Sequence, residues 1–261
     1  MDRRWALGLL TGLVAGCGTM PNPDLVSRVV DVPPQSFTVE TQPVQNLRGI
    51  GPFMSRLDLV PFVQTADGWY QPVSSRTGLE TTVDDPDMVR LTDASASLGG
   101  RRPFTLKHLM PHHRYRVYAL AYDAYGGLIS RVQRGDWLDL DLGLQDRPRA
   151  SASLPVHLET QPQKARVAVA LRYLPPMRVG RVQVRLDLVG DHVYLPVIRA
   201  DVGGAPKVVA IANLRPAATY RITVSALGTH DEPVDAHQLE VLTSDGGGIP
   251  QPTVTIGTKG P

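Results

Sequence analysis

The segment FTLKHLMPHHRYRVYALA, at residues 104–121, is followed 105 positions later by a related segment, VAIANLRPAATYRITVSA, at residues 209–226. Five of the eighteen positions are identical in the two segments, including a Leu, a Pro and a Tyr at the same spacing. Each segment has the pattern of a strand, a Leu-x-Pro turn and a Tyr that opens the next strand. Recurrence of such a unit indicates two copies of one structural module.

The residues after each turn alternate as a half-buried strand requires. Tyr115 begins one face, which continues with small and apolar residues, and Arg114 begins the other. Pro111 and Pro216 fix φ where the chain turns and lack the N–H that a strand ladder would use. A Tyr at the first inward position can bury its ring while its hydroxyl bonds to the backbone of the turn. We therefore expect Tyr115 and Tyr220 to form structural tyrosine corners.

The composition is that of a globular protein with two domains. The chain has 261 residues, 42% hydrophobic and 20% charged, and this length suits two modules of about 110 residues. The many Gly and Pro residues fit short strands joined by turns. The formal net charge of +2 is too small to indicate a nucleic-acid partner.

Three further short segments recur in the same order in both halves, with offsets that change along the chain. The change from 119 to 129 predicts ten extra residues in the second copy, around residues 163–179. The change from 124 to 105 predicts nineteen extra in the first, around residues 74–100, with a short helix near residues 85–92. The recurring segments are residues 40–43 and 159–162, residues 56–60 and 185–189, and residues 70–73 and 194–197.

Residues 1–16 have the features of a secretion signal. Arg3 and Arg4 precede an apolar run of twelve residues, which is shorter than the ~20 needed to cross a bilayer. The run ends in VAGC at residues 14–17, which resembles the lipobox of bacterial lipoprotein signal peptides. The resemblance implies cleavage before Cys17, acylation of this residue and a stable membrane anchor. Ordinary secretion with an incidental cysteine is the alternative.

Cys17 and the residues after it indicate which membrane the protein is anchored to and exclude an intramolecular disulfide. Gly18 stands where an Asp would resemble the inner-membrane retention signal of enteric bacteria, so we expect the outer membrane. Residues 17–35 are expected to form the lipidated terminus and a tether, on the order of 25 Å long as a flexible chain. Because Cys17 is the chain's single cysteine, no intramolecular disulfide is possible.

The remaining chain is expected to be all-β. Residues 138–142 and 182–188 alternate apolar and polar side chains, as antiparallel sheets with one wet face do. Each module resembles a fibronectin type III or immunoglobulin-like sandwich, and the chain resembles bacterial lipoproteins that carry such modules in tandem. We place the modules at residues 36–148 and 149–257, and a disordered tail at 258–261. In this scheme residues 152–159 are the first strand of the second module.

No enzyme motif is recognisable in the sequence, and we expect no catalytic residue, cofactor or metal ion. His112 and His113 are adjacent in a turn but lack an acidic or Cys partner at a ligand spacing. The acidic segment at residues 84–87 could offer oxygen ligands to Ca²⁺, although Pro86 interrupts it.

One strip of side chains is a candidate binding surface. Exposed Tyr and Arg residues could stack on sugars or anchor a protein partner. The interpretation that we favour is that they cover the contact between the modules or the outer face of the sheet. The strip consists of Arg114, Arg116, Tyr118, Tyr122 and Tyr125.

Together these features predict a non-enzymatic lipoprotein of the bacterial cell envelope, held to the membrane by acyl chains on Cys17. Its tandem sandwiches would act as a structural spacer and as a binding module for an envelope protein or glycan. A carbohydrate-binding or adhesive surface lipoprotein is the alternative. No nucleic-acid partner is expected.

Overall fold

The computed structural model describes residues 35–42, 54–93, 101–124, 126–143, 151–159, 164–175, 177–245 and 247–257. The predicted signal peptide, Cys17, the tether up to residue 34 and the C-terminal tail lie outside these residues. The described residues form strands and no helix. The strands are β1 (Gln35–Thr41), β2 (Met54–Gln64), β3 (Tyr70–Pro72), β4 (Leu91–Asp93), β5 (Arg102–Leu109), β6 (Arg114–Asp123), β7 (Trp137–Asp141), β8 (Ser151–Leu154), β9 (Ala165–Tyr173), β10 (Arg181–Val189), β11 (Tyr194–Gly203), β12 (Val208–Leu214), β13 (Thr219–Leu227), β14 (Pro233–Leu242) and β15 (Thr253–Ile256).

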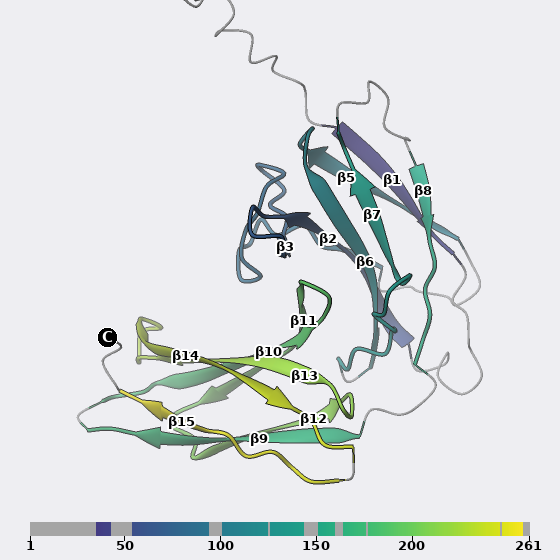
Figure 1. Ribbon diagram of the computed structural model, residues 1–261. Helices are drawn as coiled ribbons and strands as arrows, with labels where there is room; N and C mark the ends of the chain where they lie inside the picture. The colour runs from purple at the N-terminus through teal and green to yellow at the C-terminus, as the bar shows by residue number, and fades with distance from the viewer. Residues whose placement is uncertain are drawn as a thin grey trace, which may run out of the picture. The chain divides into compact units, whose positions relative to one another are not determined.

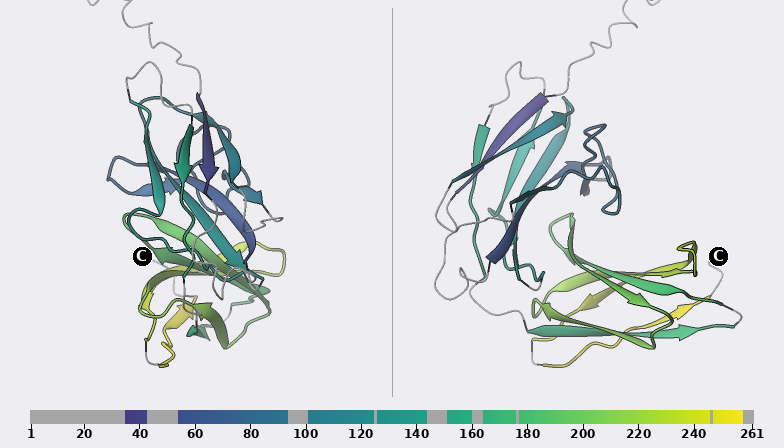
Figure 2. Two further views of the ribbon diagram at one scale, coloured as in Figure 1. Left: turned by 90° about the vertical axis from the view of Figure 1, so that its right-hand side faces the viewer. Right: turned by 180° about the vertical axis from the view of Figure 1, so that it is seen from behind.

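The strands build two sandwiches, each with a smaller and a larger sheet (Figure 1). In the first sandwich the orders are β5-β1-β8 and β3-β2-β6-β7, with the short β4 added to β2. In the second they are β12-β9-β15 and β11-β10-β13-β14, and Figure 2 shows the same strands from two other sides. Apart from β4, the two orders match strand for strand. The predicted all-β fold of two tandem sandwiches is confirmed.

The last strand of each sandwich runs parallel to its first strand. Val39 of β1 lies opposite Ala152 of β8, and Leu171 of β9 lies opposite Val254 of β15. β8 therefore belongs to the first sandwich, and the prediction that residues 152–159 open the second sandwich is wrong. The predicted division after residue 148 separates β8 from the sheet that it joins. Alternation in the sequence shows which residues of a strand face inward, but it does not identify the remote strand with which it pairs.

Strand register shows which recurring segments are equivalent. Phe62 lies opposite Arg116, and Asp187 lies opposite Arg221. Because the two arginines are equivalent, Phe62 and Asp187 are equivalent as well, at an offset of 125. The five-residue identity at an offset of 129 is therefore four positions out of register. An even shift leaves the inward and outward faces of a strand unchanged, so the sequence pattern could not reveal the error.

The length difference between the two copies is also revised. Phe37 lies opposite Leu106, and Val167 lies opposite Ile211, so the first strands of the two copies are 130 positions apart. The first copy is longer at this point, and the ten extra residues predicted in the second copy are absent. Pro72 lies opposite Phe62 and Pro196 lies opposite Asp187, so the recurring segment that begins at Tyr70 is in register. The nineteen extra residues of the first copy therefore fall between β3 and β5.

This longer connection contains turns and β4, and the helix predicted near residues 85–92 is not formed. The carboxylate of Asp85 accepts a hydrogen bond from the amide of Asp87 at 2.8 Å. Such a local side-chain bond gives the backbone an alternative to the helix. Leu91 then pairs with Leu59 of β2, which extends the sheet.

The two tyrosine corners have the predicted hydrogen bonds. The amide of Met110 donates to the Tyr115 hydroxyl at 2.8 Å, and the amide of Arg215 donates to the Tyr220 hydroxyl at 3.0 Å. Both rings are buried. The Tyr115 hydroxyl also donates to the carbonyl of Gly78 at 2.8 Å, and burial raises the pKa of Tyr115 to about 12.

The backbone of the corner repeats as well. His108 and Asn213, at equivalent positions, have φ values of 62° and 58°. His112 and Ala217, also equivalent, have φ values of 62° and 49°. A non-glycine residue rarely adopts this left-handed region, so the same unusual turn has formed twice.

We expect Tyr220→Phe to lower the free energy of unfolding by about 1 kcal/mol, because one hydrogen bond is lost. Tyr115→Phe should cost more, about 2 kcal/mol, because the buried Gly78 carbonyl also loses its donor. Urea denaturation of the two variants measures both values. Midpoints equal to that of the parent protein would show that the corners do not stabilise the fold.

Candidate functional site

The candidate site is the contact between the two sandwiches, on the outer face of the first sandwich's larger sheet. Strands β2 and β6 are buried along nearly their whole length rather than at every second residue. Their outward side chains pack in one hydrophobic cluster with residues of the second sandwich. The outward buried residues are Val60, Phe62, Tyr118, Leu120 and Tyr122.

The structure settles the position of most of the candidate strip. Tyr118 and Tyr122 are each 1% exposed and Arg116 is 8% exposed. They cover the contact between the modules, as the favoured interpretation predicted, and the alternative of an exposed ligand-binding strip is wrong for these three residues. Arg114 is exposed and pairs with Asp141 at 3.2 Å. Tyr125 lies outside the described residues.

The second sandwich contributes the connection between β10 and β11 to this contact. The amide of Tyr70 donates to the carbonyl of His192 at 2.8 Å. The Arg116 guanidinium donates to the carbonyl of Asp191 at 2.8 Å, and the hydroxyl of Tyr122 donates to a carbonyl of β11 at 3.3 Å. The contact therefore combines apolar packing with hydrogen bonds to main-chain groups.

Arg116 lies between two aromatic rings in this contact. Its guanidinium carbon is 4.2 Å from the ring centroid of Tyr70 and 4.5 Å from that of Trp137. Its Nε donates to Asp139 at 2.8 Å. Burial alone would lower the pKa of Arg116, but the hydrogen bond to Asp139, together with smaller contributions from Tyr118, the charge of Asp139 and Tyr70, raises it. A buried guanidinium with ring and carboxylate partners keeps its charge at an acceptable cost.

Arg221, the equivalent arginine of the second sandwich, is also covered by an aromatic ring. The guanidinium of Arg221 lies 3.5 Å from the ring centroid of Tyr194 and bonds Asp187 at 3.1 Å. Trp69 of the first sandwich stacks on Tyr194, with centroids 4.8 Å apart and planes at 10°. Each copy thus provides an Arg–Tyr pair to the contact.

The two copies differ on the outer face of the larger sheet. Tyr118 and Leu120 of the first copy are equivalent to Thr223 and Ser225 of the second. The burial of β13 alternates strictly, whereas β6 is buried on both faces. A strand buried on both faces reads as a nearly continuous apolar run. The sequence signal that could have located this contact is the difference between VYALAY at residues 117–122 and ITVSAL at residues 222–227.

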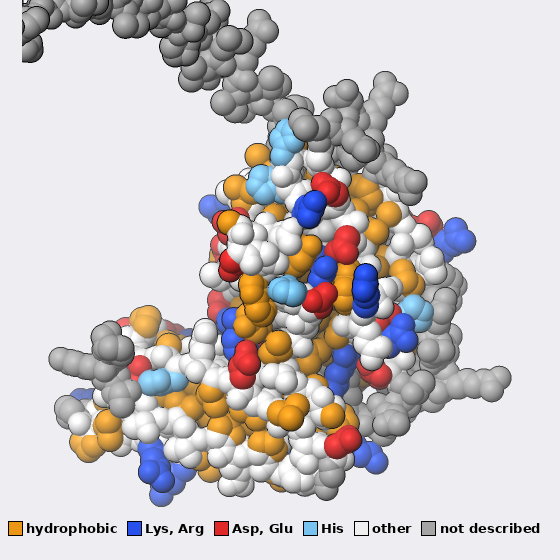
Figure 3. Space-filling view, in the orientation of Figure 1, with side chains coloured by type: hydrophobic (Ala, Val, Ile, Leu, Met, Phe, Trp, Pro, Cys, Tyr) orange, Lys and Arg blue, Asp and Glu red, His pale blue; other side chains and the backbone are white. Residues whose placement is uncertain are grey.

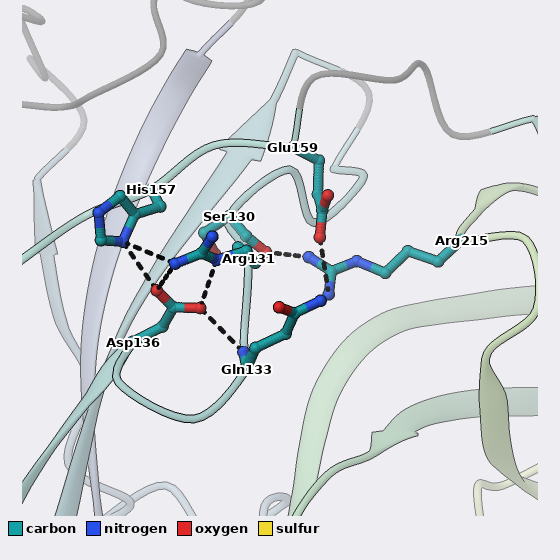
Figure 4. A network of polar contacts seen from close by, with 7 residues as sticks. All are labelled: Ser130, Arg131, Gln133, Asp136, His157, Glu159 and Arg215. Atoms are coloured by element: carbon teal, nitrogen blue, oxygen red, sulfur yellow. Dashed lines mark hydrogen bonds and ion pairs between the residues drawn. The ribbon is translucent and has the colours of Figure 1, made fainter.

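A network of polar side chains in the first sandwich lies near the tyrosine corner of the second sandwich (Figure 4). Asp136 is 3% exposed and accepts two hydrogen bonds from Arg131, both at 2.8 Å. It also bonds His157 at 2.7 Å and the amide of Gln133 at 2.9 Å. Burial alone would raise the pKa of Asp136, but these bonds together lower it.

Arg215 joins this group to the second sandwich (Figure 4). Its guanidinium donates to the carbonyl of Ser130 and lies 3.7 Å from the Glu159 carboxylate. Burial lowers the pKa of Arg215, against the smaller opposing effect of Glu159. The first copy has Met110 at the equivalent position. Arg215 was not among the predicted site residues, although the sequence shows a charged side chain in place of an apolar one at this position of the repeated corner.

The acidic and histidine segments have structural partners. Asp84 pairs with Arg185 of the second sandwich, and Asp87 pairs with Arg76 at 2.7 Å. His113 bonds a main-chain carbonyl of its own turn at 2.9 Å. In the part of the chain that the structure describes, no group of three or more His, Cys, Asp or Glu side chains could hold a metal ion.

The surface shown in Figure 3 has acidic, basic and hydrophobic side chains interspersed over it. Among the described residues, we found no helix with the length and apolar character that a membrane crossing requires.

Comparison with known proteins gives remote similarities. No protein-family model and no curated protein matches the chain. The FN1–FN3 domains of chicken CNTN1 share 15% identity with a TM-score of 0.27, covering 72% of this chain and 57% of that one. A candidate adhesin from Bacteroides ovatus shares 12% identity with a TM-score of 0.24, covering 97% and 100%. GBS52, the minor pilin of Streptococcus agalactiae, shares 11% with a TM-score of 0.27, covering 84% and 94%.

We expect Tyr118→Ala to lower the free energy of unfolding by about 3 kcal/mol, because it removes a large buried ring from the contact. The matched control is Thr223→Ala, at the equivalent position of the second sandwich, which should be nearly neutral. Chemical denaturation of both variants tests the difference. Equal stabilities would mean that the outer face of β6 is not buried in solution.

Asp136→Asn should lower the free energy of unfolding at pH 7 by about 2 kcal/mol, because several charge-assisted hydrogen bonds are weakened. The pKa of Asp136 is lower in the folded state than its unfolded value of about 3.9. The parent protein's excess in free energy of unfolding over Asp136→Asn is therefore fully present above the unfolded pKa, and it is lost as the pH falls through the folded pKa.

Urea titrations of this variant between pH 7 and pH 3 provide the measurement. Asp141→Asn, whose carboxylate is exposed, should behave like the parent protein across this range. A loss in Asp136→Asn that does not shrink with acid would show that the charge of Asp136 is not the stabilising feature.

Proposed function

We propose that this chain is a lipid-anchored envelope protein whose two sandwiches form one spacer and binding arm without enzymatic activity. The observation that carries the proposal is the single hydrophobic cluster that continues from the outer face of β2 and β6 into the second sandwich. Interfaces between domains of one chain allow relative motion unless they are large and hydrophobic. This contact combines a shared hydrophobic cluster with hydrogen bonds between the sandwiches.

The polar contacts between the sandwiches support the same proposal. Arg116, Arg185 and Arg215 each cross from one sandwich to the other or to the segment that joins them. Such directional bonds favour one arrangement over alternatives that would bury the same apolar area. A spacer requires this property, because its ends must keep a fixed separation.

Membrane anchoring is the second part of the proposal and rests on the sequence. The VAGC segment at residues 14–17 follows a basic and an apolar stretch in the order of a lipoprotein signal. Acylation of Cys17 with several chains would hold the protein stably at the membrane. Gly18 favours the outer membrane, and a Pro-rich segment separates the cysteine from β1.

The partner is proposed to be another envelope component. The carbohydrate-binding alternative loses its candidate surface, because Tyr118 and Tyr122 cannot stack on a sugar while they are buried. The buried carboxylates Asp58, Asp136 and Asp187 are each engaged by arginine. This arrangement supports a structural role for them rather than acid–base chemistry.

The proposal is tested by crosslinking in native envelopes, with a tagged full-length chain and its Cys17→Ala variant. We expect the parent protein in the membrane fraction with a stoichiometric partner, and the variant in the soluble fraction without it. A Gly16→Ala variant, which keeps the cysteine, serves as the control. Unchanged fractionation of Cys17→Ala would exclude the lipid anchor, and a parent protein that is recovered alone would exclude the stable partner.

A further inference from the structure

The edge of the second sandwich's smaller sheet differs from the equivalent edge of the first. β12 and β5 are equivalent edge strands, each paired on one side with the first strand of its sandwich. Among the described residues, no strand pairs with the other side of β12. Edge strands of this kind are templates for pairing with another chain unless charge, proline or irregularity blocks them.

The first sandwich has a proline and a charged residue on its edge strand, and residues 208–212 of the second have neither. The outward positions of β5 are Pro103, Thr105 and Lys107, so the edge lacks one N–H and carries one charge. The equivalent positions of β12 are Val208, Ala210 and Ala212. All three are exposed, and Val208 remains 55% exposed. The contrast arises at the same place in two copies of one fold.

The hydrogen bonds of β9 show which backbone groups of β12 are available. The amide of Leu171 bonds the Lys207 carbonyl at 2.8 Å, whereas the amides of Ala168 and Ala170 bond carbonyls before β15. Hydrogen-bonding direction alternates along a strand, so residues 207, 209 and 211 face β9. The N–H and C=O groups of Val208 and Ala210 therefore point toward the open edge.

We propose that this edge pairs with the same edge of a second copy of the chain, antiparallel and about a two-fold axis at Ala210. Ala210 would exchange two backbone hydrogen bonds with Ala210 of the second copy, and Val208 would lie opposite Ala212. The register keeps both inner faces on the same side of a continuous six-stranded sheet.

Charge favours a second copy as the occupant. The residues from Val208 to Ala212 carry no charge, so the strand meets its own copy without repulsion. The flanking Lys207 would lie at the end of the paired stretch, where the backbone of the second copy departs from the ladder at Asn213, and not opposite another lysine. Self-pairing of β5 about Thr105 would instead set Pro103 against Lys107. The register shift between Ile211 and Leu214 limits the pairing to a short length.

The dimer is expected to be weak and reversible, since a pairing of about five residues buries less than the ~1,200 Å² typical of stable complexes. It does not depend on the membrane anchor and goes beyond the proposed function. A failure of anchoring or of the envelope partner would leave this prediction unchanged.

The first experiment is disulfide crosslinking in a full chain that carries Cys17→Ala, so that the introduced cysteine is alone. We expect Ala210→Cys to form a covalent dimer several-fold more efficiently than Thr105→Cys, the matched position on β5. Directly opposed strand residues lie about 5.5 Å apart at Cα, within the range of a disulfide. Equal yields in the two variants would overturn the proposal.

The second experiment is sedimentation equilibrium over a range of concentrations. The Cys17→Ala chain should show a mass that rises with concentration, and adding Ala210→Lys should weaken this association about tenfold or more, because two like charges would then face each other. Thr105→Lys should have no effect. A monomeric mass at every concentration, or association that persists in Ala210→Lys, would overturn the proposal. Crosslinking of Ala210→Cys to a different envelope protein would replace the second copy as the occupant.

Discussion

The outer face of the sheet formed by β2 and β6 is apolar, and the need to cover it explains much of the remaining structure. A sandwich buries one face of each sheet by itself, but here Phe62, Tyr118 and Tyr122 also require cover on the other face. Apolar residues of the second sandwich share one hydrophobic cluster with these side chains, and Arg116 bonds the connection between β10 and β11 while its guanidinium stays between two rings. Removing water from the face therefore couples the two copies.

The sequence predicted the local features of the fold well. The spacing of Pro111 and Tyr115 was sufficient for the corner, because a turn of fixed geometry depends only on residues that are close in the chain. The alternation of apolar and polar residues was sufficient for most strands. Both predictions rest on short-range constraints, and the structure shows the expected hydrogen bonds in both copies.

Features that depend on remote pairing could not be predicted in the same way. A shift of four residues leaves the faces of a strand unchanged, so the five-residue identity led to the wrong equivalence between β2 and β10. β8 was assigned to the wrong sandwich for a related reason, because its partner β1 lies more than 100 residues away. The residue types of the candidate strip predicted that it forms a contact. That Tyr118 is buried there depends on packing with the second sandwich, which the local sequence does not reveal.

Differences between the two copies therefore carry more information on function than their identities. Identical positions such as Tyr115 and Tyr220 maintain a fold that either copy requires. At positions where the copies diverge, the environment diverges too: Arg215 replaces Met110 and bonds the first sandwich, and Tyr118 is buried where Thr223 is not. Ala212 on the edge strand β12 stands where the first copy has Lys107, which is a third difference of this kind. Since two of these three differences already correspond to contacts between sandwiches, the third is the reasonable place to look for a contact between chains.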